Sequence, residues 1–167
     1  RGLNPGNNPA NRVIASVVVS GDMIYVPSRV RPLIAFRAGG SGNISQSHRV
    51  WSFDNGPDVP TPVTDGTYFY SVNDRGIVWC LDAKTGQEVY GSQRIRTATY
   101  SSSPVLADGK IFAINEAGVT TVLAAKPEFN VLATNKLDAA LVMATPVIVG
   151  DRIYIRSASH LYCIGKK

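Results

Sequence analysis

The chain has 167 residues, of which 44% are hydrophobic and 17% are charged, and its formal net charge is +5. This composition is typical of a globular chain with a sizeable core and excludes an intrinsically disordered one. No apolar run approaches the roughly 18 residues that a transmembrane helix needs, and the Lys and Arg residues are scattered, which favours a mildly basic surface over a nucleic-acid or membrane partner.

The first residue is Arg1, and no signal peptide precedes the first apolar segment. Such a start favours a processed chain or a piece of a longer one. Residues 1–14 are rich in Asn, Pro and Gly, which are poor strand formers, and they predict an irregular N-terminal segment.

From residue 15 onward the sequence repeats with a period of 42 residues. A Thr or Ser followed by Pro-Val recurs at 61–63, 103–105 and 145–147, and an apolar run begins seven residues after each proline. An Asp or Gly turn lies between the two segments. A fourth copy precedes these three, and in it Val17 takes the place of the proline. Internal repeats of this length indicate a solenoid, a propeller or an array.

Each unit predicts four short antiparallel strands separated by Gly, Asp and Asn turns. The fourth strands are expected to end near Trp51, Tyr90 and Leu132, and no window shows helical periodicity. The fold class is therefore all-β, with one β-propeller blade per unit. The units are predicted at 15–57, 58–99, 100–141 and 142–167, the last without its fourth strand.

Two departures from the period stand out. A polar, Gly-rich insertion follows the third strand of the first unit at 39–48. The last unit stops after its third strand, and the N-terminal segment is a poor candidate to complete it. We therefore expect the C-terminal part of a larger ring of seven or eight blades, although four repeats can in principle close by themselves.

No constellation of reactive residues points to catalysis. His48 and His160 have no Cys or carboxylate at ligand spacing, and the serines at 101–103 lack a nucleophile elbow. Cys80 and Cys163 occupy the same place in alternate units, which argues against a disulfide and favours two buried, small hydrophobic side chains. No catalytic, cofactor-binding or metal-binding residue is predicted.

The best candidate for binding is the edge of the ring where the second and third strands of each unit connect. Charged residues recur in these turns, and we predict that they form a partner-binding rim: Arg29, Arg31, Asp74, Arg75, Glu116 and Arg156. At each position, a solvated turn is the alternative.

The stretch from Leu81 to Tyr90 resembles the repeat of the pyrroloquinoline-quinone (PQQ) type of propeller, whose signature has Asp, Ala, Thr-Gly and a closing Trp in this order. Here Asp82, Thr85 and Gly86 match, Tyr90 replaces the Trp, and Trp51 holds the matching place in the first unit. The third unit departs from the signature. The resemblance covers residues 15–167 and implies a structural role, in which the Trp docks onto the next blade and the Asp and Thr fix the turn.

The resemblance implies two functional classes. Non-catalytic members are scaffolds for protein–protein contact, and quinoprotein dehydrogenases bind the quinone and calcium. Because the chain lacks the adjacent cysteines of the dehydrogenases, the scaffold class is the first expectation, without a cofactor and with other protein chains or the remaining blades of a longer polypeptide as partners. The alternative is a part of a dehydrogenase whose catalytic residues lie in other blades. Members are typically periplasmic or otherwise extracytoplasmic.

Overall fold

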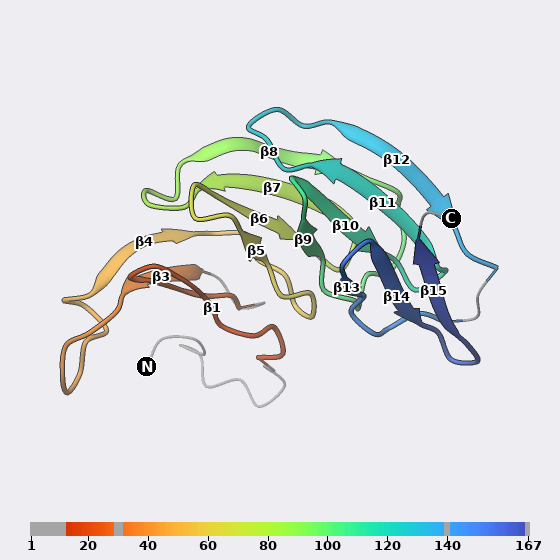
Figure 1. The fold of residues 1–167 in the computed structure, drawn as a ribbon. Coiled ribbons are helices and arrows are strands. Elements are labelled where there is room, and N and C mark those ends of the chain that lie inside the picture. The colour runs from red at the N-terminus through yellow and green to blue at the C-terminus, as the bar shows by residue number, and fades with distance from the viewer. Residues whose placement is uncertain (1–12, 29–31, 139–140, 166–167) are drawn as a thin grey trace.

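The computed structural model describes residues 13–28, 32–138 and 141–165, which form four antiparallel sheets (Figure 1). Blade 1 contains β1 (Val18–Ser20), β2 (Met23–Val26), β3 (Leu33–Arg37) and β4 (Arg49–Phe53). Blade 2 contains β5 (Val63–Thr64), β6 (Tyr68–Val72), β7 (Ile77–Asp82) and β8 (Glu88–Arg94). Blade 3 contains β9 (Val105–Ala107), β10 (Lys110–Ile114), β11 (Val119–Ala124) and β12 (Val131–Lys136). Blade 4 contains β13 (Val147–Val149), β14 (Arg152–Arg156) and β15 (Leu161–Gly165).

The predicted all-β propeller architecture is confirmed. The strands of each sheet are ordered as they are in the sequence, and the four sheets follow one another along an arc (Figure 1). Trp51, Tyr90 and Leu132 lie within the fourth strands rather than at their ends. No helix in the described ranges is long and apolar enough to cross a membrane.

The hydrogen-bond register repeats from sheet to sheet. The pairing of the third strand with the fourth shifts at Ala35, at Cys80 and at Val122, which are equivalent positions of blades 1, 2 and 3. A β-bulge bends and twists a strand locally. Its recurrence at one position shows that the sequence repeat is also a repeat of backbone geometry.

Apolar side chains fill the spaces between neighbouring blades, which we call seams. Nine buried residues around Tyr25, Trp51 and Phe69 fill the seam between blades 1 and 2, and nine around Tyr70, Cys80 and Tyr100 fill the next. The seam between blades 3 and 4 has only three. Since buried apolar area is the main stabilising contribution, the third seam is the weakest.

Hydrogen bonds between equivalent residues also join the blades. The N–H of Ser16 donates to the Thr61 hydroxyl (2.9 Å), that of Thr61 to the Ser103 hydroxyl (2.9 Å), and that of Ser103 to the Thr145 hydroxyl (3.2 Å). We call this series the hydroxyl belt. It explains structurally why a Ser or Thr precedes the recurring proline or valine.

The linkers between blades are held by the turns between second and third strands. The N–H of Glu116 donates to the carbonyl of Thr99, and the N–H of Tyr100 donates to the carbonyl of Asp74. The same two bonds recur 42 residues later, from Ala158 to Leu141 and from Val142 to Glu116. The linkers between blades 2 and 3 and between blades 3 and 4 are thus each fixed by two successive blades.

Candidate partner-binding rim

The turn at residues 82–86, between β7 and β8, is stabilised by hydrogen bonds among its own residues, and we call it the Asp82 turn. Its Oδ1 accepts the N–H of Lys84 (3.0 Å), the N–H of Thr85 (2.8 Å) and the hydroxyl of Thr85 (2.9 Å). The bonds from Thr85 are the main reason that the pKa of the Asp82 carboxyl lies below its ordinary value. Because all of these bonds are local, the role of this carboxylate is to stabilise the turn.

Trp51 of blade 1 docks on this turn of blade 2. Its indole N–H donates to the carbonyl of Ala83 (3.0 Å), which also accepts the hydroxyl of Tyr25 (3.1 Å). Gly86 has a φ of 71°, and a Cβ there would lie 2.5 Å from the Trp51 ring. The turn therefore needs glycine both for its backbone and for the indole.

The docking residue changes along the chain. In blade 2 the equivalent residue is Tyr90, whose ring packs edge-on against Phe129 of blade 3 with centroids 5.7 Å apart. In blade 3 it is Leu132, whose side chain is 47% exposed. The outer part of blade 3 is thus left without a docking partner among the described residues of blade 4.

The two cysteines differ in their surroundings. Both are free, and Cys80 is buried, which raises the pKa of its thiol to about 12. Cys163 is exposed, so the expectation that both are buried is wrong. Its register position matches that of Cys80, because each lies opposite a tyrosine, Tyr154 or Tyr70. The Cys163 side of blade 4, however, faces no further described sheet.

The rim is the edge of the arc formed by the turns between second and third strands. Among its predicted residues, Arg29 and Arg31 lie outside the described ranges. The Asp74 carboxylate accepts the backbone N–H groups of Asp58 (2.9 Å) and Val59 (3.0 Å) in the linker between blades 1 and 2. It therefore fixes the position of that linker.

Glu116 occupies the equivalent turn of blade 3. Its Oε1 accepts the hydroxyl of Ser101 at 2.6 Å, and Ser101 lies in the linker that leads into blade 3. Both predicted acids of the rim are half-buried and bonded to linkers. Neither side chain is thus available as a simple solvated charge.

The cations of the rim remain exposed. Arg75 and Arg156 belong to the predicted set, and the structure adds three at the adjoining ends of the fourth strands: Arg94, Arg96 and Lys136. None of the five forms an ion pair within the described part of the chain. Two exposed acids, Asp54 and Asp138, lie at the same edge.

The sequence contained a signal for the three added cations. In an antiparallel sheet of four strands, the fourth strand ends beside the connection between the second and the third. A charged residue at that end therefore shares the rim with the turn. Our prediction considered only the turns, so it missed Arg94, Arg96 and Lys136.

The opposite edge has a different charge arrangement. There Arg37 approaches Asp22 (3.9 Å), Lys110 approaches Asp108 (2.6 Å) and Arg152 approaches Asp151 (3.9 Å). His48 of the insertion also lies on this side, with its Nδ1 2.9 Å from the Ser47 hydroxyl. Within the described residues, no group of three metal-ligating side chains gathers.

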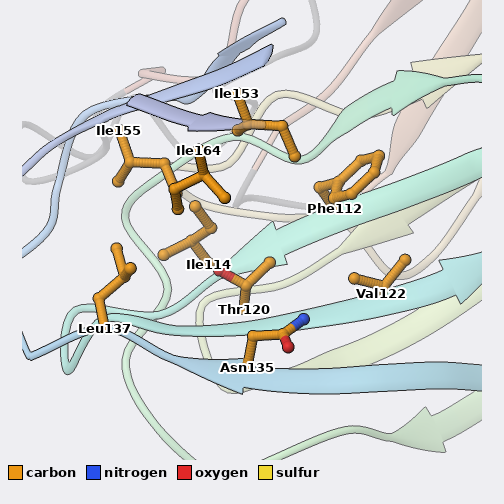
Figure 2. Close-up of a pocket in the computed structure, with 9 residues that line it drawn as sticks. All are labelled: Phe112, Ile114, Thr120, Val122, Asn135, Leu137, Ile153, Ile155 and Ile164. Carbon is orange, nitrogen blue, oxygen red and sulfur yellow. The ribbon is translucent and has the colours of Figure 1, made fainter. Parts of the chain in front are cut away.

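One apolar cavity of about 170 Å³ lies in the seam between blades 3 and 4. Figure 2 shows side chains of blade 4, such as Ile153 and Ile164, pointing across it toward Phe112 of blade 3. Among the described residues that line it, Thr120 and Asn135 have polar side chains and the other seven are apolar. The cavity is a packing defect of the weakest seam, and its mainly apolar lining is like that of a protein core.

The sequence matches a known protein family, and the fold is similar to several solved structures. The PQQ_2 family model, described as outer membrane protein assembly factor BamB, matches residues 10–167. No curated protein sequence matches the chain.

Several solved structures are similar in fold. BamB from Moraxella catarrhalis aligns with a TM-score of 0.74 and 14% identity, over 92% of this chain and 43% of that one. The computationally designed Ika8 protein aligns with a TM-score of 0.72 and 10% identity, over 92% and 46%. The quinohemoprotein alcohol dehydrogenase ADHIIG from Pseudomonas putida HK5 aligns with a TM-score of 0.66 and 16% identity, over 89% and 28%.

The chain thus spans less than half the length of each of these three structures. The match of the family model covers nearly all of the chain, and the repeated sheets have the same architecture as these structures. The chain belongs to the PQQ-like repeat family whose model is described as outer membrane protein assembly factor BamB.

Proposed function

We propose that the chain is a non-catalytic propeller scaffold whose rim binds an acidic segment of a partner protein. One observation carries the proposal. Five exposed cations share the rim without an ion pair among the described residues, whereas three of the cations at the opposite edge, Arg37, Lys110 and Arg152, each approach a carboxylate. Cationic side chains without an ion pair attract carboxylates over a distance, and a guanidinium group can bind a carboxylate with two hydrogen bonds at contact. Among the five, the Arg94 guanidinium already donates to the carbonyl of Arg75 (3.0 Å).

The hydrogen bonds of the rim support this role. The Asp74 carboxylate fixes the linker between blades 1 and 2, and the Glu116 carboxylate fixes the linker between blades 2 and 3. Backbone bonds also join the second of these linkers to both of its blades. The backbone that carries Arg75 is therefore held in place before any partner arrives. Preorganisation of this kind lowers the entropy lost on binding.

The family supports the rest of the proposal. Its model is described as an outer membrane protein assembly factor, which favours a place in a protein complex outside the cytoplasm. The partner on the rim is another protein chain, and the remaining blades of a longer polypeptide are the further partners that the short span of the alignments supports.

A charge-reversal variant tests the rim. Arg75→Glu, Arg96→Glu and Arg156→Glu are combined, and the matched control combines Arg37→Glu, Lys110→Glu and Arg152→Glu at the opposite edge. A fluorescent peptide of alternating Glu and Gly serves as the probe, and its binding is followed by anisotropy against salt concentration. We expect the rim variant to lose at least tenfold in affinity and the control to lose far less.

The native partner is sought with the same variants. Affinity-tagged protein is isolated from the cell envelope, and its associated chains are quantified by mass spectrometry. The proposal requires a chain that is retained by the wild type and by the control but lost from the rim variant. Equal binding of peptide and chains by both variants contradicts it.

The second candidate is a part of a quinoprotein dehydrogenase. Its supporting observation is the likeness in fold to the quinohemoprotein alcohol dehydrogenase from Pseudomonas putida. The native protein is incubated with pyrroloquinoline quinone and calcium, and dye-linked oxidation of alcohols is measured. Turnover at a rate that depends on both additions favours the dehydrogenase and contradicts the scaffold.

A further inference from the structure

The linker between blades 3 and 4 departs from its repeat where it crosses the rim. The linker between blades 2 and 3 has polar residues at two positions, Thr99 and Ser101, whereas Leu141 and Met143 occupy these positions 42 residues later. The turn residue that bonds to the linker changes in the same way, because the position of Glu116 in blade 3 is taken by Ala158 in blade 4. Three polar side chains of one repeat are thus apolar in the next.

The large apolar side chains of this linker are exposed on a fixed backbone. Leu141 is 48% exposed and Met143 is 55% exposed, whereas Val142 between them is completely buried. The N–H of Val142 donates to the carbonyl of Glu116 (3.0 Å), and the carbonyl of Leu141 accepts the N–H of Ala158 (2.9 Å). Leu141, Met143 and Ala158 therefore present a rigid apolar surface, which we call the apolar rim patch.

The fold itself does not call for apolar residues at these positions. Thr99 makes the same backbone hydrogen bond as Leu141, so the linker forms equally well with a polar side chain. Thr99 is also exposed, although blades 2 and 3 lie on either side of its linker and blade 4 follows. A following blade therefore does not cover this position. Apolar side chains that gather on a surface among polar residues mark sites of binding.

Cations of the rim adjoin the patch. Arg156 ends β14 and directly precedes the turn that contains Ala158, and Lys136 ends β12 shortly before the linker. Both are exposed and form no ion pair within the described ranges. The exposed acid Asp138 lies two residues after Lys136, which leaves the cations in excess. A segment that reaches the patch therefore meets apolar surface and positive charge together.

We propose that the apolar rim patch binds large apolar side chains of the same partner segment whose carboxylates bind the rim cations. The inference rests on the proposed function and specifies its partner as a protein segment in which residues such as Leu, Ile or Phe adjoin Asp or Glu. Burial of the apolar side chains supplies affinity, and the charges supply orientation and fast association. Because backbone bonds fix the linker in advance, binding costs little conformational entropy.

Three fluorescent peptides of equal length test the inference. The first is the alternating peptide of Glu and Gly, the second has two neighbouring glycines replaced by leucine, and the third is the leucine peptide with every Glu replaced by Ser. Anisotropy measures their affinity for the native protein. We expect the acidic leucine peptide to bind about tenfold tighter than either of the others, because only this peptide uses both the patch and the cations.

A variant of the linker shows whether the patch causes this preference. Leu141→Thr and Met143→Ser are combined, which gives this linker the residues that the preceding linker already carries. We expect the variant to bind the peptide of Glu and Gly as the native protein does and to lose most of the preference for leucine. Leu132→Thr is the matched control and keeps the preference, because Leu132 is 47% exposed but lies near the start of β12, away from the rim. Circular dichroism and melting temperature show whether each variant remains folded.

The methionine methyl groups report the contact directly. The chain has two methionines, of which Met23 is buried in the seam between blades 1 and 2 and Met143 is exposed in the patch. In protein labelled with carbon-13 at these methyl groups, we expect the acidic leucine peptide to shift the Met143 signal and leave the Met23 signal unchanged. The linker variant retains only Met23, so its spectrum assigns the two signals.

Three outcomes overturn the inference: equal affinity of the native protein for the acidic leucine peptide and either other peptide, a preference for leucine that survives in the linker variant, or binding of the leucine peptide without a shift of the Met143 signal. In each case, the proposed function stands if the charge-reversal variant of the rim still loses the peptide of Glu and Gly. Equal binding of both acidic peptides by the native protein and that rim variant contradicts the proposed function and, with it, this inference.

Discussion

Gly86 combines two constraints that a matched pair of variants separates. Gly86 and Gly109 both have a positive φ, but a Cβ at Gly109 meets nothing within 4 Å, whereas one at Gly86 meets Trp51. We expect Gly109→Ala to lower the free energy of unfolding by about 1 kcal/mol through its backbone alone. Gly86→Ala is expected to cost clearly more, because the indole must also move. Urea denaturation of the two variants measures the difference, and equal losses contradict a role for Trp51.

The Asp82 carboxylate makes stability depend on pH. Hydrogen bonds from Thr85 lower its pKa in the folded chain below the ordinary value of 3.8. Its contribution is therefore fully present above that value and is lost as the pH falls through the folded pKa. We expect Asp82→Asn to be less stable than the wild type at pH 7 and the difference to shrink below about pH 4. Melting temperatures from pH 7 to pH 3 measure it, and a constant difference contradicts the assignment.

The third seam, between blades 3 and 4, can be stabilised by substitution. Thr120 places a hydroxyl at the apolar cavity between blades 3 and 4, and valine has nearly the same shape without the polar group. We expect Thr120→Val to raise the free energy of unfolding by about 0.5–1 kcal/mol. Thr134→Val on the exposed surface of β12 serves as the control and changes it by less than about 0.5 kcal/mol. Loss of stability in Thr120→Val shows instead that the hydroxyl has a polar partner.

The repeat made the sheets predictable, because strand length, turn residues and period are local properties of the chain. The hydrogen-bond partners of the charged turn residues could not be predicted in this way. Asp74 and Glu116 look like solvated turn residues in the sequence, yet their partners are linker residues 15 to 16 positions away that approach only when the arc forms. The hydroxyl belt was visible as a recurring Ser or Thr, but its bonds join residues 42 to 45 positions apart. Such contacts depend on the angle between neighbouring blades, and this angle cannot be predicted from local sequence patterns.

Stability along the arc is expected to be uneven, because each blade contacts only its neighbours. In repeat proteins the total is approximately a sum of the stability of each unit and of the interfaces between units. Blade 2 contributes to two seams with nine buried residues each, whereas blade 4 contributes only to the seam with three. Local opening should therefore begin at blade 4.

Amide hydrogen exchange measures this gradient. We expect the slowest exchange in β6, β7, β10 and β11, and exchange at least tenfold faster in β14, although its backbone is paired on both sides. Equal protection of all four blades contradicts the inequality of the seams.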